Sequence, residues 1–81
     1  MKRNRKSEYN EYVNAVIYYD GGNTFTTICK TRQEAETEAK AQWDKLSIED
    51  RQTRRIIACT AVKGIAWYKP TEIIYVEYGR K

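Results

Sequence analysis

Two stretches in the first part of the chain have the β-branched and aromatic composition of strands, and a turn sequence separates them. The first stretch covers Tyr12 to Tyr19, and the second runs from Thr24 to Lys30. Between them, Asp20-Gly21-Gly22-Asn23 consists of residue types that favour a tight turn. The pattern therefore predicts a β-hairpin over residues 12–30.

The first strand of this hairpin has apolar residues on both of its faces. Successive strand residues point to opposite sides, so the strand divides into two alternating sets. One set contains Asn14 and the other consists of Val13, Ala15, Ile17 and Tyr19. Because the second set has no side-chain amide, we expect it to face the core.

The segment after the hairpin carries the start signal of an α-helix. Thr31-Arg32-Gln33-Glu34 fits a capping box, in which the Thr31 hydroxyl accepts from the Glu34 amide and the Glu34 carboxylate reaches back. The residues up to Leu46 are rich in helix formers and include neither Gly nor Pro. One helix face carries an apolar stripe made of Ala35, Ala39, Trp43 and Leu46, which we expect to pack on the sheet.

The rest of the chain adds a short helical turn and two more strands. Ser47-Ile48-Glu49-Asp50 is a second cap signal, and Ile56 to Val62 and Glu72 to Tyr78 have strand composition. Pro70 is expected to lie outside the strand ladder, because it has no N–H to donate. The element order β-β-α-β-β predicts an α+β fold, with a four-stranded antiparallel sheet and one helix packed on one face.

The charge of the chain is concentrated at its start. Of the 15 Lys and Arg residues, Lys2, Arg3, Arg5 and Lys6 precede every acidic residue, and the remaining eleven balance 11 Asp and Glu. We therefore expect residues 1–8 to be a basic disordered arm and residues 9–81 to form a single domain. A neutral folded body argues against a dedicated nucleic-acid-binding domain.

Several chemistries are disfavoured by composition. The chain has no His, which removes the commonest general base and metal ligand and any Ser-His or Cys-His pair. We expect no catalysis, no cofactor and no metal. Cys29 and Cys59 lack a CxxC spacing, so we expect two buried reduced thiols, unless adjacent strands bring them together as a disulfide.

The location of the protein is inferred from its apolar runs. The longest runs are far below the length of a membrane span, and no apolar stretch follows the basic start as it does in a signal peptide. The sequence therefore predicts a cytoplasmic protein without a membrane partner.

Two groups of side chains are candidate binding sites. The first is an aromatic patch that we expect on the sheet face away from the helix, formed by Tyr12, Tyr18, Tyr68 and Tyr75. Because Tyr is favoured at protein interfaces, this patch predicts binding to an unknown protein or to a second copy of the chain. The second group would contact nucleic acid and consists of Lys2, Arg3, Arg5, Lys6, Arg51, Arg54 and Arg55. The alternative for this group is a solubilising tail with arginines paired to Glu49 and Asp50.

Two resemblances bear on function. The hairpin followed by Thr31 to Glu36 looks like the sheet-to-helix junction of arm-type DNA-binding domains of tyrosine integrases, in which a three-stranded sheet enters the major groove. Here only two strands precede the helix, and residues 12–29 contain no Lys or Arg to reach phosphates. We therefore do not carry over the DNA-binding role.

The run from Glu36 to Arg51, with Trp43, Leu46 and Ser47 before Glu49-Asp50-Arg51, is similar to small uncharacterised proteins of phages and integrative elements of Gram-positive gut bacteria. The resemblance implies a mobile-element origin and carries no catalytic motif. From these observations we expect a small binding protein that acts by protein–protein interaction. The alternative is a weak nucleic-acid-binding protein that uses its basic amino-terminal arm.

Overall fold

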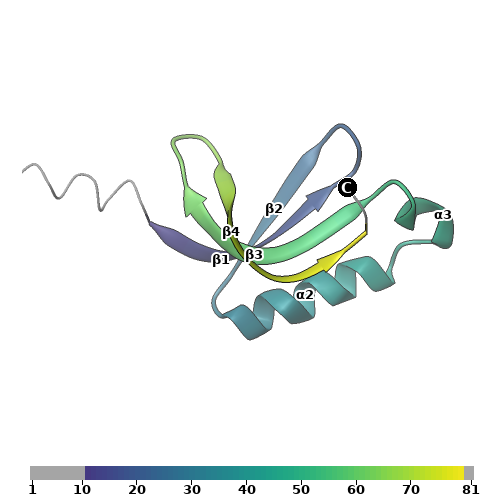
Figure 1. Ribbon diagram of the computed structural model, residues 1–81, viewed down its shortest axis with the longest axis horizontal. Coiled ribbons are helices and arrows are strands. Elements are labelled where there is room, and N and C mark those ends of the chain that lie inside the picture. The colour runs from purple at the N-terminus through teal and green to yellow at the C-terminus, as the bar shows by residue number, and fades with distance from the viewer. Residues whose placement is uncertain (1–10, 80–81) are drawn as a thin grey trace, which may run out of the picture.

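The computed structural model describes residues 11–79 and confirms the predicted α+β architecture. The elements follow in the order β1 (Tyr12–Tyr19), β2 (Thr24–Cys29), α2 (Arg32–Asp44), α3 (Ile48–Arg51), β3 (Arg55–Lys63) and β4 (Tyr68–Tyr78). All strand pairs are antiparallel, and the sheet order is β2-β1-β3-β4. Figure 1 shows α2 along one face of the sheet, with the tips of both hairpins on the other side. The predicted basic arm lies outside the described residues.

Both predicted cap signals begin helices. The Thr31 hydroxyl accepts from the Glu34 N–H at 3.0 Å, and the Ser47 hydroxyl accepts from the Asp50 N–H at 3.1 Å. The Glu34 carboxylate reaches back one residue further than a capping box requires, because it accepts from the Lys30 N–H at 2.8 Å. Caps of this kind stabilise a helix by about 1 kcal/mol each.

The main core lies between α2 and the sheet. Ala35 and Ala39 of α2 are fully buried against Val16, Ile56 and Ala58 of the two central strands. Two alanines on this face let the helix axis approach the sheet closely, since they have no bulk beyond Cβ. The larger residues of the predicted stripe, Trp43 and Leu46, are partly buried at the carboxyl end of the helix and pack against the same cluster. The predicted packing of this stripe is confirmed.

The face assignment of β1 needs a correction. The helix packs on Val16 and Tyr18, whereas Ile17 belongs to a second buried cluster with Ile57 and Cys59. Period-2 alternation places this second cluster on the opposite face of the sheet. The expectation of a single core-facing set is wrong, because both faces of the central strands are buried.

A bulge in β4 decides which of its side chains face the helix. Ala58 pairs with Val76, but the next residue, Cys59, pairs with Ile74, which leaves Tyr75 as an extra residue. As a result Tyr75 and Val76 both pack against the helix-side cluster, although strict alternation would separate them. A second register shift follows between Cys59 and Ala61.

Pro70 also differs from its predicted position. It lies inside β4, opposite Ala61, rather than outside the strand ladder. The sheet tolerates it because β4 is an edge strand, on which a backbone nitrogen can face solvent without a hydrogen bond.

Candidate functional site

The tyrosines predicted to form one aromatic patch are distributed over both faces. Tyr18 and Tyr75 pack against the cluster under α2, so the prediction that they lie on the face away from the helix is wrong. Tyr12 pairs with Val62, and Tyr68 pairs with the next residue, Lys63. Because neighbouring strand residues point to opposite faces, Tyr12 and Tyr68 do not share a surface.

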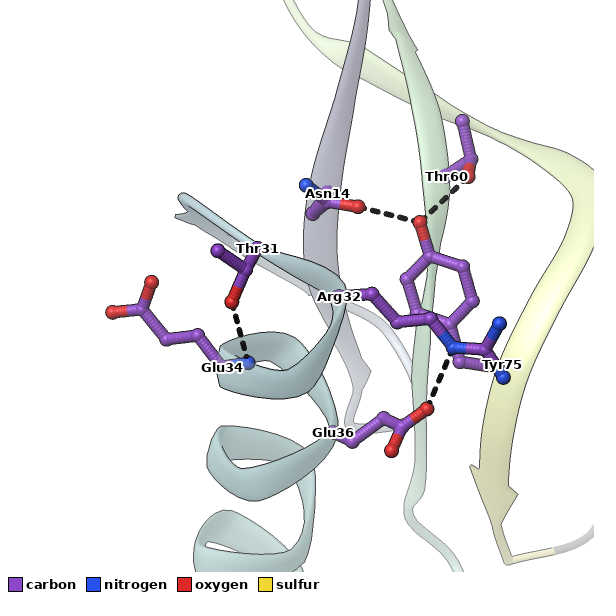
Figure 2. A network of polar contacts seen from close by, with 7 residues as sticks. All are labelled: Asn14, Thr31, Arg32, Glu34, Glu36, Thr60 and Tyr75. Carbon is purple, nitrogen blue, oxygen red and sulfur yellow. Dashed lines mark hydrogen bonds and ion pairs between the residues drawn. The ribbon is translucent and has the colours of Figure 1, made fainter.

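Tyr75 belongs to a polar network that joins the sheet to the first turn of α2 (Figure 2). Its hydroxyl donates to Asn14 Oδ1 at 2.6 Å and lies 2.7 Å from Thr60 Oγ1. The Arg32 guanidinium lies 4.8 Å from the centre of the Tyr75 ring and is paired with Glu36 at 2.8 Å. Because these contacts occupy the hydroxyl and one face of the ring, Tyr75 has a structural role.

The three predicted nucleic-acid-binding arginines within the described residues do not form one patch. Arg51 lies over the Trp43 ring at 5.2 Å, whereas Arg55 lies over the Tyr19 ring at 5.4 Å. Trp43 packs on the helix side of the sheet and Tyr19 on the opposite side. The three guanidinium groups therefore point to two different faces.

Two of these arginines also have carboxylate partners. Arg54 lies 3.8 Å from Asp50, and Arg55 lies 2.7 Å from Glu77. The pairing of Arg54 with Asp50 was one of the alternatives that the sequence left open. Lys2, Arg3, Arg5 and Lys6, the other members of the predicted group, lie outside the described residues.

The two edges of the sheet differ in how they discourage pairing with another strand. On β4, Pro70, two register shifts and the charged residues Lys69, Glu72 and Glu77 interrupt the edge. On β2, residues 24–29 include no charge and no Pro, and the register with β1 is continuous. Every residue of β2 except Cys29 is exposed. The β2 edge therefore has none of the protection that β4 has.

The turn between β1 and β2 defines which backbone groups of β2 point outward. The Asp20 N–H donates to the Asn23 carbonyl at 3.1 Å, so this pair is hydrogen-bonded. Hydrogen-bonded and non-hydrogen-bonded pairs alternate along an antiparallel ladder. By this alternation Thr24, Thr26 and Ile28 direct their N–H and C=O groups away from β1. A strand added at this edge would bind these groups.

A shallow groove of about 250 Å³ lies beside the β2 edge, on the helix side. Its lining comes from two parts of the fold and consists of Tyr18, Phe25, Thr27, Gln42, Lys45 and Leu46. Phe25 is 53% exposed, and its ring lies 6.0 Å from the Tyr18 ring in a tilted arrangement. The groove thus has a mostly apolar lining to which Lys45 adds a positive charge.

The cysteines do not provide a reactive thiol. Both are free and buried, as predicted, and they lie on β2 and β3, which are separated by β1. Burial raises the pKa of the Cys29 thiol, and it raises the pKa of the Cys59 thiol to about 11. Both thiols are therefore protonated at neutral pH, and the thiolate form needed for nucleophilic attack is scarce.

Within residues 11–79, no group of three or more His, Cys, Asp or Glu side chains is arranged to hold a metal ion. No helix in the same range is long and apolar enough to cross a membrane.

Among the residues of the β2 edge and its groove, Tyr18 alone belonged to a site proposed from sequence, and there it was assigned to the other face of the sheet. The sequence did contain one signal, since residues 24–29 are β-branched or aromatic apart from Cys29 and lack charge. The edge position of this strand depends on the strand order, which the sequence does not state. Comparison of the chain with protein-family models, curated proteins and solved structures finds no match.

Proposed function

We propose that this protein is a small binding protein that captures an extended segment of a partner protein at the β2 edge and catalyses no reaction. One observation carries the proposal: an uncharged, uninterrupted edge strand lies directly beside an apolar groove. Strand addition at such an edge obtains affinity from main-chain hydrogen bonds and specificity from pockets for alternate side chains.

The geometry defines what the bound segment would look like. Its backbone would pair with the outward groups of Thr24, Thr26 and Ile28. Every second side chain would point to the helix side, where the groove between Phe25 and Leu46 accepts an apolar residue. The positive charge of Lys45 in the groove lining favours a carboxylate next to that residue. The expected ligand is therefore an extended segment with an apolar side chain and an adjacent Asp or Glu.

A displayed library of random peptides, selected against the full-length protein, tests this proposal. Selected peptides should carry the apolar and acidic pair, and their binding should protect the amide hydrogens of Thr24, Thr26 and Ile28 from exchange with solvent. These amides exchange quickly in the free protein, because they have no partner in the β1–β2 ladder.

A matched pair of variants separates edge pairing from other effects. Thr26→Pro removes both the side-chain hydroxyl and the outward N–H, whereas Thr26→Val removes the hydroxyl alone. We expect the Pro variant to lose peptide binding and the Val variant to retain it, with similar melting temperatures for both. Equal binding by the two variants, or peptide protection confined to other strands, would contradict the proposal. Sedimentation equilibrium distinguishes peptide capture from pairing between two copies of this chain.

The origin in a phage or integrative element is part of this proposal and rests on the resemblance of residues 36–51. A small protein that binds an extended segment of a host protein fits such an origin, because masking that segment requires contact area rather than a catalytic site. Nucleic-acid binding through the basic arm is kept as the alternative. It predicts a steep loss of oligonucleotide binding with salt, and a shallower salt dependence when the arm is removed.

A further inference from the structure

The two hairpins of the fold end in turns of opposite chemistry. The β1–β2 turn is built from Asp20-Gly21-Gly22-Asn23, the polar and flexible residues that solvated turns prefer. The β3–β4 turn is Gly64-Ile65-Ala66-Trp67, closed by a hydrogen bond of 2.8 Å from the Gly64 N–H to the Trp67 carbonyl. Its two central positions are therefore held by an isoleucine and an alanine.

The apolar side chains of the second turn contribute little to the fold. Ile65 is fully exposed and Trp67 is 64% exposed, and neither belongs to a buried cluster of the described residues. Hairpin turns usually have Gly, Asn or Asp at their central positions, whereas here the isoleucine places its whole side chain in water. The tip therefore retains apolar surface that the fold does not use.

Lysines flank the tip on both strands. Lys63 ends β3 and Lys69 lies near the start of β4, and both are exposed. Residues 61–71 contain no Asp or Glu, and within residues 11–79 neither lysine forms an ion pair with a carboxylate. An apolar tip thus projects from the sheet on the side opposite α2 (Figure 1), flanked by two lysines without a carboxylate partner among residues 11–79.

We propose that the β3–β4 tip inserts into the surface of an anionic phospholipid membrane. A bilayer deforms around a convex tip, and it accepts aliphatic and aromatic side chains at the boundary between headgroups and acyl chains. Trp is favoured at that depth, and lysines on either side reach the lipid phosphates. Nucleic acid fits the tip less well, because Trp67 has a ring on which a base can stack but the fully exposed Ile65 beside it has none.

The residues of the tip are separate from the β2 edge at which we propose that a partner protein binds. The expectation of no membrane partner rested on the absence of an apolar run long enough to span a bilayer. A hairpin tip needs no such run, since it only enters the interface.

Co-sedimentation of the full chain with vesicles tests the proposal. Vesicles of phosphatidylcholine mixed with phosphatidylglycerol are compared with vesicles of phosphatidylcholine alone, at low and physiological salt. We expect binding to the mixed vesicles and about a fivefold loss for each of Lys63→Gln and Lys69→Gln. Ile65→Ser should reduce binding about tenfold, because the inserted side chain is lost.

Ile48→Ser is the matched control. Ile48 is 75% exposed on α3, away from the tip, so its replacement removes the same exposed side chain without affecting the proposed contact. The emission of Trp67, obtained as the difference between the wild-type chain and Trp67→Phe, should shift to the blue on vesicle binding. Trp43 is present in both proteins and cancels in this difference.

Three results would overturn the proposal. The first is no co-sedimentation with the mixed vesicles at low salt. The second is binding that Ile65→Ser leaves intact but that is lost when Lys2, Arg3, Arg5 and Lys6 are replaced by Ala, which would mean adsorption through the arm. The third is loss of oligonucleotide binding in Trp67→Ala without any vesicle binding, which would assign the tip to nucleic acid.

Discussion

The hydroxyl of Tyr75 offers a direct test of the network that joins α2 to the sheet. Tyr75→Phe keeps the ring, and with it the Arg32 contact and the apolar packing, but removes the bonds to Asn14 and Thr60. Each bond contributes about 1 kcal/mol, and the partly buried acceptor and hydroxyl left behind lose their partner. We therefore expect a loss of about 2 kcal/mol in the free energy of unfolding.

Urea and thermal denaturation followed by circular dichroism measure this loss. In a domain of this size, 2 kcal/mol corresponds to a fall in melting temperature of about 8 to 16 °C. The control is Tyr12→Phe, which changes the same group on an exposed residue and should leave stability within about 0.5 kcal/mol. Asn14→Ala should cost less in the Tyr75→Phe background than in the wild type, because the two residues share a bond. A Tyr75→Phe protein as stable as Tyr12→Phe would refute this account of the network.

Two further predictions concern Trp43 and Cys59. Trp43 is partly buried and stacks on Tyr78 with ring centres 5.7 Å apart. Trp43→Ala should therefore lower the free energy of unfolding, measured by urea denaturation, by about 3 kcal/mol. Trp67→Ala is the control, because Trp67 is exposed and its loss should cost less than about 0.5 kcal/mol. Burial raises the pKa of Cys59 from 9.0 to about 11, so the folded state favours the protonated thiol. The contribution of this thiol to the free energy of unfolding is complete below about pH 9 and falls as pH rises toward 11. Cys59→Ala should lack this fall, so an equal decline of its unfolding free energy between pH 9 and 11 would contradict the assignment.

The local signals in the sequence were reliable because short-range contacts produce them. Thr31 and Ser47 cap their helices through amides three residues ahead, so the pattern of four residues contains both partners of the bond. The turn from Asp20 to Asn23 is equally local, since its closing hydrogen bond lies within the turn. These signals located the hairpin and both helices to within a few residues.

The face assignments were less predictable because they depend on distant partners. Asn14 appeared to mark the solvent-facing side chains of β1. Its side chain instead accepts a hydrogen bond from the Tyr75 hydroxyl of β4 and donates one to the Lys30 carbonyl. The bulge at Tyr75 breaks the alternation along β4, so that Tyr75 and Val76 both pack on the helix side. Neither fact is visible in the composition of either strand taken alone.

The amino-acid sequence by itself determined the element order, the helix starts and the apolar stripe of α2, because each depends on residues close together in the chain. Only the tertiary structure decided that β2 lies at an edge and that Lys45 and Leu46 line the groove beside it. It also decided that the four tyrosines of the predicted patch lie on two faces. Strand order and register are set by how all the strands pack together under one helix. The candidate binding edge follows from that packing, since only the outermost strand of a sheet has backbone groups without a neighbouring strand.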